Sequence, residues 1–231
     1  TKTEREIANI ISISGGKDST ALCIHALEKG TENIHPVFAD TGHEHPETYK
    51  YIDYLQKELG ELTIIKADFT EEIQRKRNLV QTKWREEGIS EDIIQQALEV
   101  LHPTGIPFLA LCLWKGRFPS STAQFCTKFL KVVPIFDKVY LPLMNEGKHI
   151  VSWQGIRAQE SRRRAKMTER EDTPEGFEIY RPLINWKVED VFAIHKKYHI
   201  KPNPLYKKGM GRVGCMPCIN SNKIEIFEIA R

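Results

Sequence analysis

The amino-acid sequence predicts an α/β protein built on a parallel β-sheet with helices on both faces. Two observations predict this fold. First, apolar strand-like runs alternate with helix-like segments through the first third of the chain, as in a parallel sheet covered by helices. Second, the region from residue 201 onward is rich in Pro, Gly and Asn, which indicates that a long structured loop, carrying cysteines, follows the sheet. With 231 residues, 40% hydrophobic and 28% charged, we expect residues 1–231 to form a single domain.

Each element follows from its local pattern. Short apolar runs rich in β-branched residues predict buried strands, and these runs are residues 7–13, 34–39, 62–67 and 150–153. Apolar residues at helical spacing predict helices, which begin at residue 19 and cover 47–59, parts of 71–99, 128–139, 188–198 and 224–231. Residues 102–124 are rich in Pro, Gly, Phe and Ser, and we expect them to be irregular.

A glycine-rich loop follows the first expected strand. Its residues are Ser14, Gly15, Gly16, Lys17, Asp18, Ser19 and Thr20. The glycines let the backbone turn tightly and bring N–H groups up to an anion, and the next helix adds free donors and a favourable dipole. Lys17 adds a full positive charge, so we expect the loop to bind phosphate or pyrophosphate. It is not a Walker A loop, because Asp18 follows the lysine and Ile11 stands at the first glycine position.

Two further motifs end expected strands at the same edge of the sheet, where open parallel sheets bind ligands. Asp40, Thr41 and Gly42 follow the second strand, and Gly155 and Arg157 follow the strand at 150–153. Asp40 could accept hydrogen bonds from a ribose or help to hold Mg²⁺, or it could be a turn or N-cap aspartate. Arg157 presents a planar fork that suits phosphate or sulfate oxygens, and Gly155 lets this loop approach a ligand.

The glycine-rich loop resembles the PP-loop of the adenine nucleotide α-hydrolase superfamily, which includes ATP pyrophosphatases, tRNA and DNA sulfur-transfer enzymes and sulfonucleotide reductases. Further motifs resemble the phosphoadenosine phosphosulfate (PAPS) reductase family. They are Asp-Thr-Gly at 40–42 with Pro-Glu-Thr-Tyr at 46–49, a Gly-x-Arg-x-x-x-Ser element ending at Ser161, and residues 181–191 and 200–218. This resemblance implies a Rossmann-like (HUP-type) fold. It also implies an adenine nucleotide bound by residues 14–20 and 40–42, Gly155, Arg157 and Ser161.

The cysteines suggest a second site. Cys215 and Cys218 have a spacing favoured by iron–sulfur and zinc sites and by thiol–disulfide motifs. Cys126 lies in a segment similar to the one that supplies cluster ligands in assimilatory APS reductases, which have two adjacent cysteines there. The resemblance implies a [4Fe–4S] cluster rather than zinc, bound within about 102–134 and 200–220. Cys112 would be its fourth ligand, or else a buried apolar cysteine, and Cys23 is expected in a helix core.

Reductases of this family also use a catalytic cysteine in a C-terminal Glu-Cys-Gly-x-His segment, which residues 1–231 do not contain. Either it lies beyond Arg231 or this chain performs other chemistry. We expect a PP-loop ATP pyrophosphatase that adenylates an acceptor during sulfur transfer, similar to DNA phosphorothioation proteins. Lys17, Asp18, Ser19 and Arg157 would be catalytic, with Mg²⁺ neutralising phosphate charge. The alternatives are an APS or PAPS reductase that releases sulfite, and a non-catalytic, cluster-bearing nucleotide sensor in a complex.

Composition restricts the partners and the location less strongly. A net charge of +3 by itself predicts no nucleic-acid partner. Neither a membrane span nor a signal peptide is visible, so we expect a cytoplasmic protein with no membrane partner. In that reducing compartment, five cysteines favour metal or redox chemistry over disulfides. Sulfur transfer implies a donor such as a cysteine desulfurase, nucleic acid bound through other subunits, and a homo-oligomer or larger complex.

Overall fold

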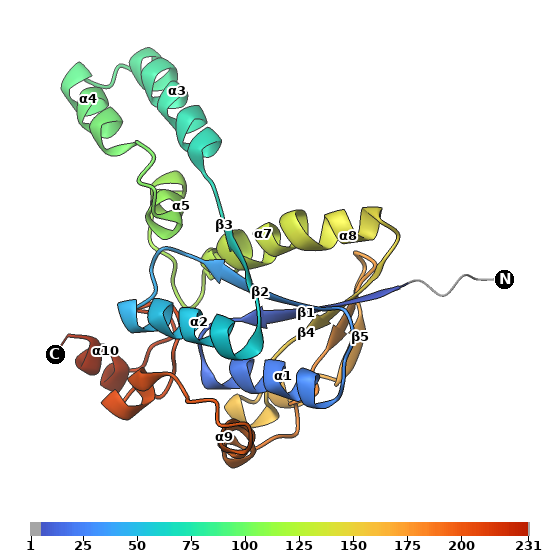
Figure 1. Ribbon diagram of the computed structural model, residues 1–231. Coiled ribbons are helices and arrows are strands. Elements are labelled where there is room, and N and C mark those ends of the chain that lie inside the picture. Colours follow the sequence, from blue (N-terminus) through green and yellow to red (C-terminus); the bar gives the residue numbers. More distant parts are fainter. Residues whose placement is uncertain (1–5, 231) are drawn as a thin grey trace.

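The computed structural model describes residues 6–230 and contains one six-stranded sheet (Figure 1). Its strands are β1 (Ile7–Ile13), β2 (Ile34–Asp40), β3 (Thr63–Lys66), β4 (His149–Trp153), β5 (Arg170–Asp172) and β6 (Glu178–Tyr180). Their order is β3-β2-β1-β4-β6-β5, and every neighbouring pair is parallel except β5 with β6. The predicted α/β fold is confirmed. The strand order reverses at β1, which lies between β2 and β4, and ligands bind at such a switch point.

Strand β1 is buried on both faces. Side chains alternate along a strand, so Ile11 and Ile13 face one side of the sheet, and Ala8 and Ile10 face the other. The first side packs against α1 (Lys17–Glu28), α2 (Pro46–Leu59) and α9 (Val188–Lys197). The second side packs against a helical stretch that covers residues 125–145. The apolar run of β1 therefore has the composition expected of a parallel strand covered by helices on both sides.

The helical stretch over the second face is continuous but changes its winding. It comprises α6 (Phe125–Thr127), η1 (Lys128–Val132), α7 (Val133–Ile135), η2 (Phe136–Tyr140) and α8 (Leu141–Asn145), of which η1 and η2 are π-helical. Pro134 and Pro142 lie within it and cannot donate a backbone hydrogen bond, so the regular helical ladder is interrupted. The helix predicted at 128–139 is confirmed and extends further at both ends.

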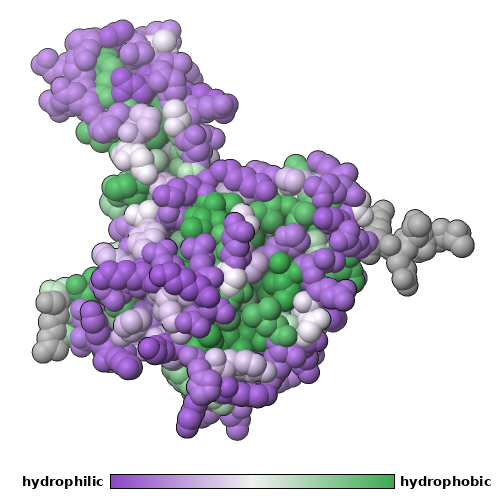
Figure 2. Space-filling view, viewed as in Figure 1, coloured by the Kyte–Doolittle hydropathy of each residue, from purple (hydrophilic) through white to green (hydrophobic). Residues whose placement is uncertain are grey.

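Two helices joined by a short turn project from the sheet as an arm (Figure 1). They are α3 (Thr70–Glu86) and α4 (Glu91–Val100), which confirms the helices predicted within 71–99. The arm has a small apolar core of its own, formed by Val80, Ile94, Leu98 and Leu101, and it is mostly hydrophilic on the face that Figure 2 shows. At its base, the Lys76 ammonium donates to the carbonyl oxygens of Leu113 and Trp114 at 3.0 and 3.1 Å. These two residues belong to α5 (Pro107–Lys115), so the lysine joins the arm to this helix by two hydrogen bonds.

Two elements differ from the sequence-based description. Helix α5 forms within residues 102–124, which the sequence predicts to be irregular. Its Pro107 occupies the first turn, where no backbone donor is needed, and Gly116 ends it in the left-handed region at φ 67°. Strands β5 and β6 are not predicted, because three residues each are too few to show strand alternation.

The C-terminal region from residue 201 is mostly loop, as predicted. It contains a 3₁₀ turn, η5 (Pro204–Lys208), and a last helix, α10 (Lys223–Ile229). That helix confirms most of the prediction for 224–231, and Arg231 lies outside the described residues. Two further 3₁₀ turns, η3 (Ala158–Glu160) and η4 (Arg164–Lys166), follow β4. Across residues 6–230, no helix has both the length and the hydropathy needed to span a membrane.

Candidate functional site

The glycine-rich loop turns sharply between β1 and α1. Gly15 has φ +73°, and a Cβ atom at this position would lie 2.8 Å from Cγ2 of Thr48, so the turn requires glycine. The Ser14 N–H donates to Oγ of Ser19 at 3.1 Å, and this hydroxyl donates to the Gly16 carbonyl at 3.0 Å. Ser19 thereby closes the loop at the N-terminus of α1, where helix N–H groups and the helix dipole favour an anion.

A buried charge cluster lies beside this loop. The Asp18 carboxylate accepts from Nζ of Lys17 at 2.9 Å and from Nε of Arg157 at 2.6 Å. Arg157 is 5% exposed and comes from the loop after β4, more than a hundred residues away in sequence. Gly155 makes this approach feasible, because a Cβ atom there would lie 3.1 Å from the Asp18 carbonyl oxygen. One carboxylate shared by two cations leaves the cluster with a net positive charge at the start of α1.

The Asp40 carboxylate is held by hydrogen bonds from the protein itself. It accepts from the Gly42 N–H, the Tyr49 hydroxyl and the Lys66 ammonium, each at 2.8 Å. Burial acts to raise the pKa of Asp40, but these hydrogen bonds outweigh burial, and the pKa is lowered. This is the geometry of the turn aspartate that the sequence also allows, and it orders the turn at Thr41. The Thr41 hydroxyl in turn donates to Glu44 at 2.7 Å.

Three side chains from the C-terminal part of the chain hold the backbone of the glycine-rich loop. Asn203 donates its amide to the Gly15 carbonyl at 3.1 Å, and the Tyr206 hydroxyl accepts the Lys17 N–H at 2.9 Å. The His195 ring lies 2.9 Å from the Lys17 carbonyl oxygen through Nε2. Sequence reasoning missed these roles. The Asn-Pro-Leu run at 203–205 is visible as a motif, but nothing in it shows which part of the chain it contacts.

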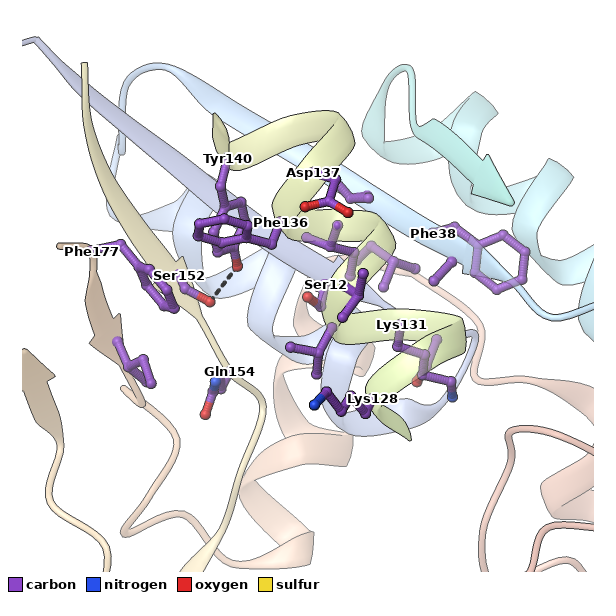
Figure 3. A pocket seen from close by; sticks show the side chains of 18 of the residues that line it. Ser12, Phe38, Lys128, Lys131, Phe136, Asp137, Tyr140, Ser152, Gln154 and Phe177 are labelled. Atoms are coloured by element: carbon purple, nitrogen blue, oxygen red, sulfur yellow. Dashed lines mark hydrogen bonds between the residues drawn. The ribbon is translucent and has the colours of Figure 1, made fainter. Parts of the chain in front are cut away.

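A cavity of about 590 Å³ opens beside the loop, between the carboxyl ends of the strands and the helical stretch at 125–145. Ser14 and Gly214 line it, so it adjoins the glycine-rich loop. Figure 3 shows Phe136, Tyr140 and Phe177 together at one end, where the Tyr140 hydroxyl donates to Ser152 Oγ at 2.7 Å. The lysines Lys128 and Lys131 reach it from the helical stretch. The sequence does not predict this cavity, because segments from β1, β2, the helical stretch, β4, the β5–β6 region and the loop at Gly214 build it together.

The Cys215 thiol lies close to the turn after β2. Its sulfur is 3.7 Å from Oγ1 of Thr41 and 3.7 Å from Oε1 of Glu44. The next residue, Met216, donates its N–H to the His43 carbonyl at 2.8 Å, which pairs the two segments. Burial raises the pKa of Cys215, although the nearby positive charge of Lys131 opposes this effect.

The four candidate ligand cysteines form two pairs in the structure. Cys112 and Cys126 lie in one apolar cluster, where burial, and secondarily the second thiol, raise the pKa of Cys112 to about 11. Cys215 and Cys218 form the other pair. Thiolates are suitable iron–sulfur ligands, but among residues 6–230 no three His, Cys, Asp or Glu side chains lie close enough to share a metal ion. The four-cysteine cluster therefore stays a prediction, and the surroundings of Cys112 are those of a buried apolar cysteine.

Two other predictions concern single residues. Cys23 lies in the core of α1, and burial raises its pKa to about 12, as expected of an inert helix cysteine. Ser161 is exposed, and its hydroxyl accepts the Arg164 N–H at 3.2 Å, which begins the 3₁₀ turn η4. Its described hydrogen bond is therefore local and does not reach the glycine-rich loop.

Comparison with known proteins agrees with the fold and the loop. The family model of the phosphoadenosine phosphosulfate reductase domain matches residues 8–221. An uncharacterised 37.8 kDa protein of Escherichia phage 186 is 49% identical over 233 residues, which cover 96% of this chain and 70% of that protein. An adenosine 5′-phosphosulfate reductase of Allochromatium vinosum is 37% identical over 65 residues, which cover 28% of this chain and 25% of that enzyme.

A solved structure is similar over nearly the whole chain. The phosphate complex of a phosphoadenylyl-sulfate reductase from Candida auris has a TM-score of 0.55 at 16% sequence identity, covering 94% of this chain and 84% of that one. At this identity the likeness shows the fold alone. The family match spans every element from β1 to the cysteine-bearing loop. The chain therefore belongs to the phosphoadenosine phosphosulfate reductase domain family.

Proposed function

We propose that this protein is a PP-loop ATP pyrophosphatase that adenylates an acceptor during sulfur transfer. The observation that carries the proposal is the junction of two features at Ser14. On one side lies a glycine-rich loop with a buried, net positive cluster of Lys17, Asp18 and Arg157. On the other lies a cavity of about 590 Å³, within the usual size range of nucleotide and cofactor sites.

The two features suit different parts of a nucleoside triphosphate. The aromatic end of the cavity, at Phe136, Tyr140 and Phe177, would accept the flat, weakly polar adenine ring. The loop N–H groups, the start of α1 and Lys17 would bind the β- and γ-phosphates. Lys128 adds a cation on the helical side of the cavity.

In the reaction, an acceptor oxygen attacks the α-phosphorus and forms a new P–O bond. The bond from the α-phosphorus to the bridging oxygen breaks, and pyrophosphate leaves with the electron pair. Lys17 and Arg157 would stabilise the negative charge that grows on pyrophosphate, and Asp18 would keep both cations aimed at it. Mg²⁺ bound to the nucleotide phosphates would supply further charge neutralisation.

A second candidate function is the reduction of APS or PAPS. The family match and the partial similarity to an adenosine 5′-phosphosulfate reductase favour it, and the same loop and cavity would hold the nucleotide. Its catalytic thiol has no counterpart among the motifs of residues 1–231. An iron–sulfur cluster on Cys112, Cys126, Cys215 and Cys218 stays a prediction, as do a cysteine desulfurase partner and assembly into an oligomer.

The experiment is to measure pyrophosphate and AMP released from ATP by the anaerobically purified protein, with sulfite release from APS and PAPS followed in parallel. We expect pyrophosphate without sulfite. Lys17→Ala should lower the rate by about 100-fold, because removing one charged contact to the transition state has that order of effect. Lys83→Ala, which removes an exposed arm lysine, is the matched control and should change nothing.

Each other outcome has a definite meaning. Sulfite release with ATP untouched would reject the adenylation proposal in favour of reduction. Tight ATP binding without any turnover would indicate the nucleotide sensor. Equal rates for Lys17→Ala and the unmodified protein would remove the glycine-rich loop from the mechanism.

A further inference from the structure

A segment next to the cavity carries only positive charge. Residues 100–136 contain no Asp or Glu, but they include Lys115, Arg117, Lys128 and Lys131. Within the described part of the chain, none of these four cations forms an ion pair. Four cations without carboxylate partners in one segment favour a ligand that brings several negative charges.

Aromatic rings lie among these cations. The Lys115 ammonium lies 4.2 Å from the ring centroid of Phe129, and the Arg117 guanidinium lies 5.7 Å from that of Phe125. The Lys128 ammonium also lies over Phe129, at 5.5 Å. The contacts join α5 and its following loop to the start of the helical stretch at 125–145. We name this set the basic–aromatic surface: Lys115, Arg117, Phe118, Phe125, Lys128 and Phe129.

Phe118 distinguishes this surface from a merely basic one. Its side chain is 69% exposed, among the highest values for a large apolar residue in the described chain. Among the described residues, its one aromatic ring contact is with Phe108, at a centroid distance of 6.2 Å. An exposed ring beside unpaired cations offers a face on which a base can stack while the cations contact phosphates.

The surface leads into the proposed active site. Lys128 belongs to both the surface and the cavity lining. Lys131, one helical turn further on, lines the cavity, and its charge opposes the effect of burial, which raises the pKa of Cys215. Phe108, which Phe118 contacts, stacks on His43 at a centroid distance of 4.2 Å, and His43 pairs with Met216. A polymer on this surface would therefore run past the mouth of the cavity and close to the Cys215 loop.

We propose that the basic–aromatic surface binds single-stranded nucleic acid. A single strand exposes both its phosphates and its base faces, whereas a duplex hides the faces and an acidic peptide has none. The position beside the cavity makes this strand the acceptor whose oxygen is adenylated. That role rests on the proposed function, whereas binding to the surface does not.

The test is fluorescence anisotropy of a labelled single-stranded DNA of about 20 nucleotides, long enough to exceed typical single-strand site sizes. Titrations with the full chain at several salt concentrations should give a log–log slope of about −3, because the three cations of the surface and the adjacent Lys131 would make four phosphate contacts that each contribute about −0.7. Arg117→Ala should weaken binding and reduce the slope by about 0.7. Phe118→Ala should weaken binding by about fivefold or more with the slope unchanged, and Phe118→Trp should restore it.

Lys83→Ala is the control, since Lys83 is an exposed cation of the arm outside the surface. Equal weakening by Lys83→Ala and Arg117→Ala, or no effect of Phe118→Ala, would overturn the proposal by showing nonspecific attraction. Competition by polyglutamate as strong as that by unlabelled DNA would overturn it in favour of an acidic protein partner. Pyrophosphate release measured on the same samples separates the two proposals: ATP turnover without DNA binding rejects only the surface, and DNA binding without turnover rejects only the adenylation.

Discussion

Replacing Arg157 by alanine would remove one of the two cations that Asp18 holds beside the glycine-rich loop. The Arg157 side chain is 6% exposed, and the Asp18 side chain is 18% exposed, so water compensates little for the lost contact. Asp18 would keep the Lys17 ammonium at 2.9 Å, which limits the damage. Truncating one partner of a buried ion pair costs about 3–5 kcal/mol, and the remaining partner reduces this to about 2–3 kcal/mol here.

This loss should appear in two assays. Thermal unfolding should show a midpoint lowered by about 4–12 °C, since each kcal/mol shifts a chain of this size by about 2–4 °C. Pyrophosphate release from ATP should fall by about 100-fold or more, because in the proposed reaction the arginine would face the charge that grows on the leaving group. Arg157→Lys should recover part of the stability and little of the rate, because lysine lacks the planar fork.

Arg163→Ala provides the control. Arg163 is exposed, lies in the same connection after β4 and forms no ion pair within residues 6–230, so both assays should give unmodified values. A midpoint lowered as far as predicted with an unchanged rate would show that Arg157 only supports the fold. An unchanged midpoint would refute the buried ion pair itself.

Three further predictions concern the residues around the site. Gly15→Ala should lower the free energy of unfolding in urea by about 2–4 kcal/mol, because the alanine would have a positive φ and a Cβ atom 2.8 Å from Thr48. The control is Gly60→Ala, which has φ 100° but open space around it and should cost only the backbone strain. The pKa of Asp40 is lowered in the folded state, so the ionised carboxylate stabilises the fold above pH 3.8, its ordinary pKa, and this stabilisation is lost as the pH falls through the lowered pKa. The difference in unfolding free energy between the unmodified protein and Asp40→Asn should therefore shrink between pH 7 and pH 3. Cys215→Ser should abolish the absorbance near about 400 nm that an iron–sulfur cluster would give the anaerobic protein, and persistent colour, or zinc in its place, would reject the cluster.

The elements with a continuous local signal could be predicted from the sequence. Strand β1 is a largely apolar run, and the glycine-rich loop that follows it leads directly into α1, so all three elements could be read from adjacent residues. Helix α5 is not predicted, because Pro107 and Gly116, each taken by itself, indicate an irregular segment. Together they are typical boundaries of a short buried helix, and the apolar residues between them support it.

The candidate site was predictable in its motifs and not in its assembly. Arg157 and the glycine-rich loop each carry a recognisable pattern, but the ion pair between Arg157 and Asp18 depends on how β1 and β4 align. The roles of Asn203 and Tyr206 and the cavity depend on contacts between distant segments, to which no local pattern corresponds. For the cysteines, the family resemblance implies four convergent ligands, whereas among residues 6–230 no three potential ligands lie close enough to share a metal ion, so the cluster stays a prediction.

The hold of Asn203 and Tyr206 on the glycine-rich loop has a consequence for dissecting this protein. The glycine-rich motif at 14–20 does not keep its shape independently, because Asn203 and Tyr206 hydrogen-bond two of its peptide groups. A chain ending at residue 200 would retain all six strands and the complete motif. It would nevertheless lose the scaffold that shapes the loop, so its failure to bind ATP would say nothing about the motif itself.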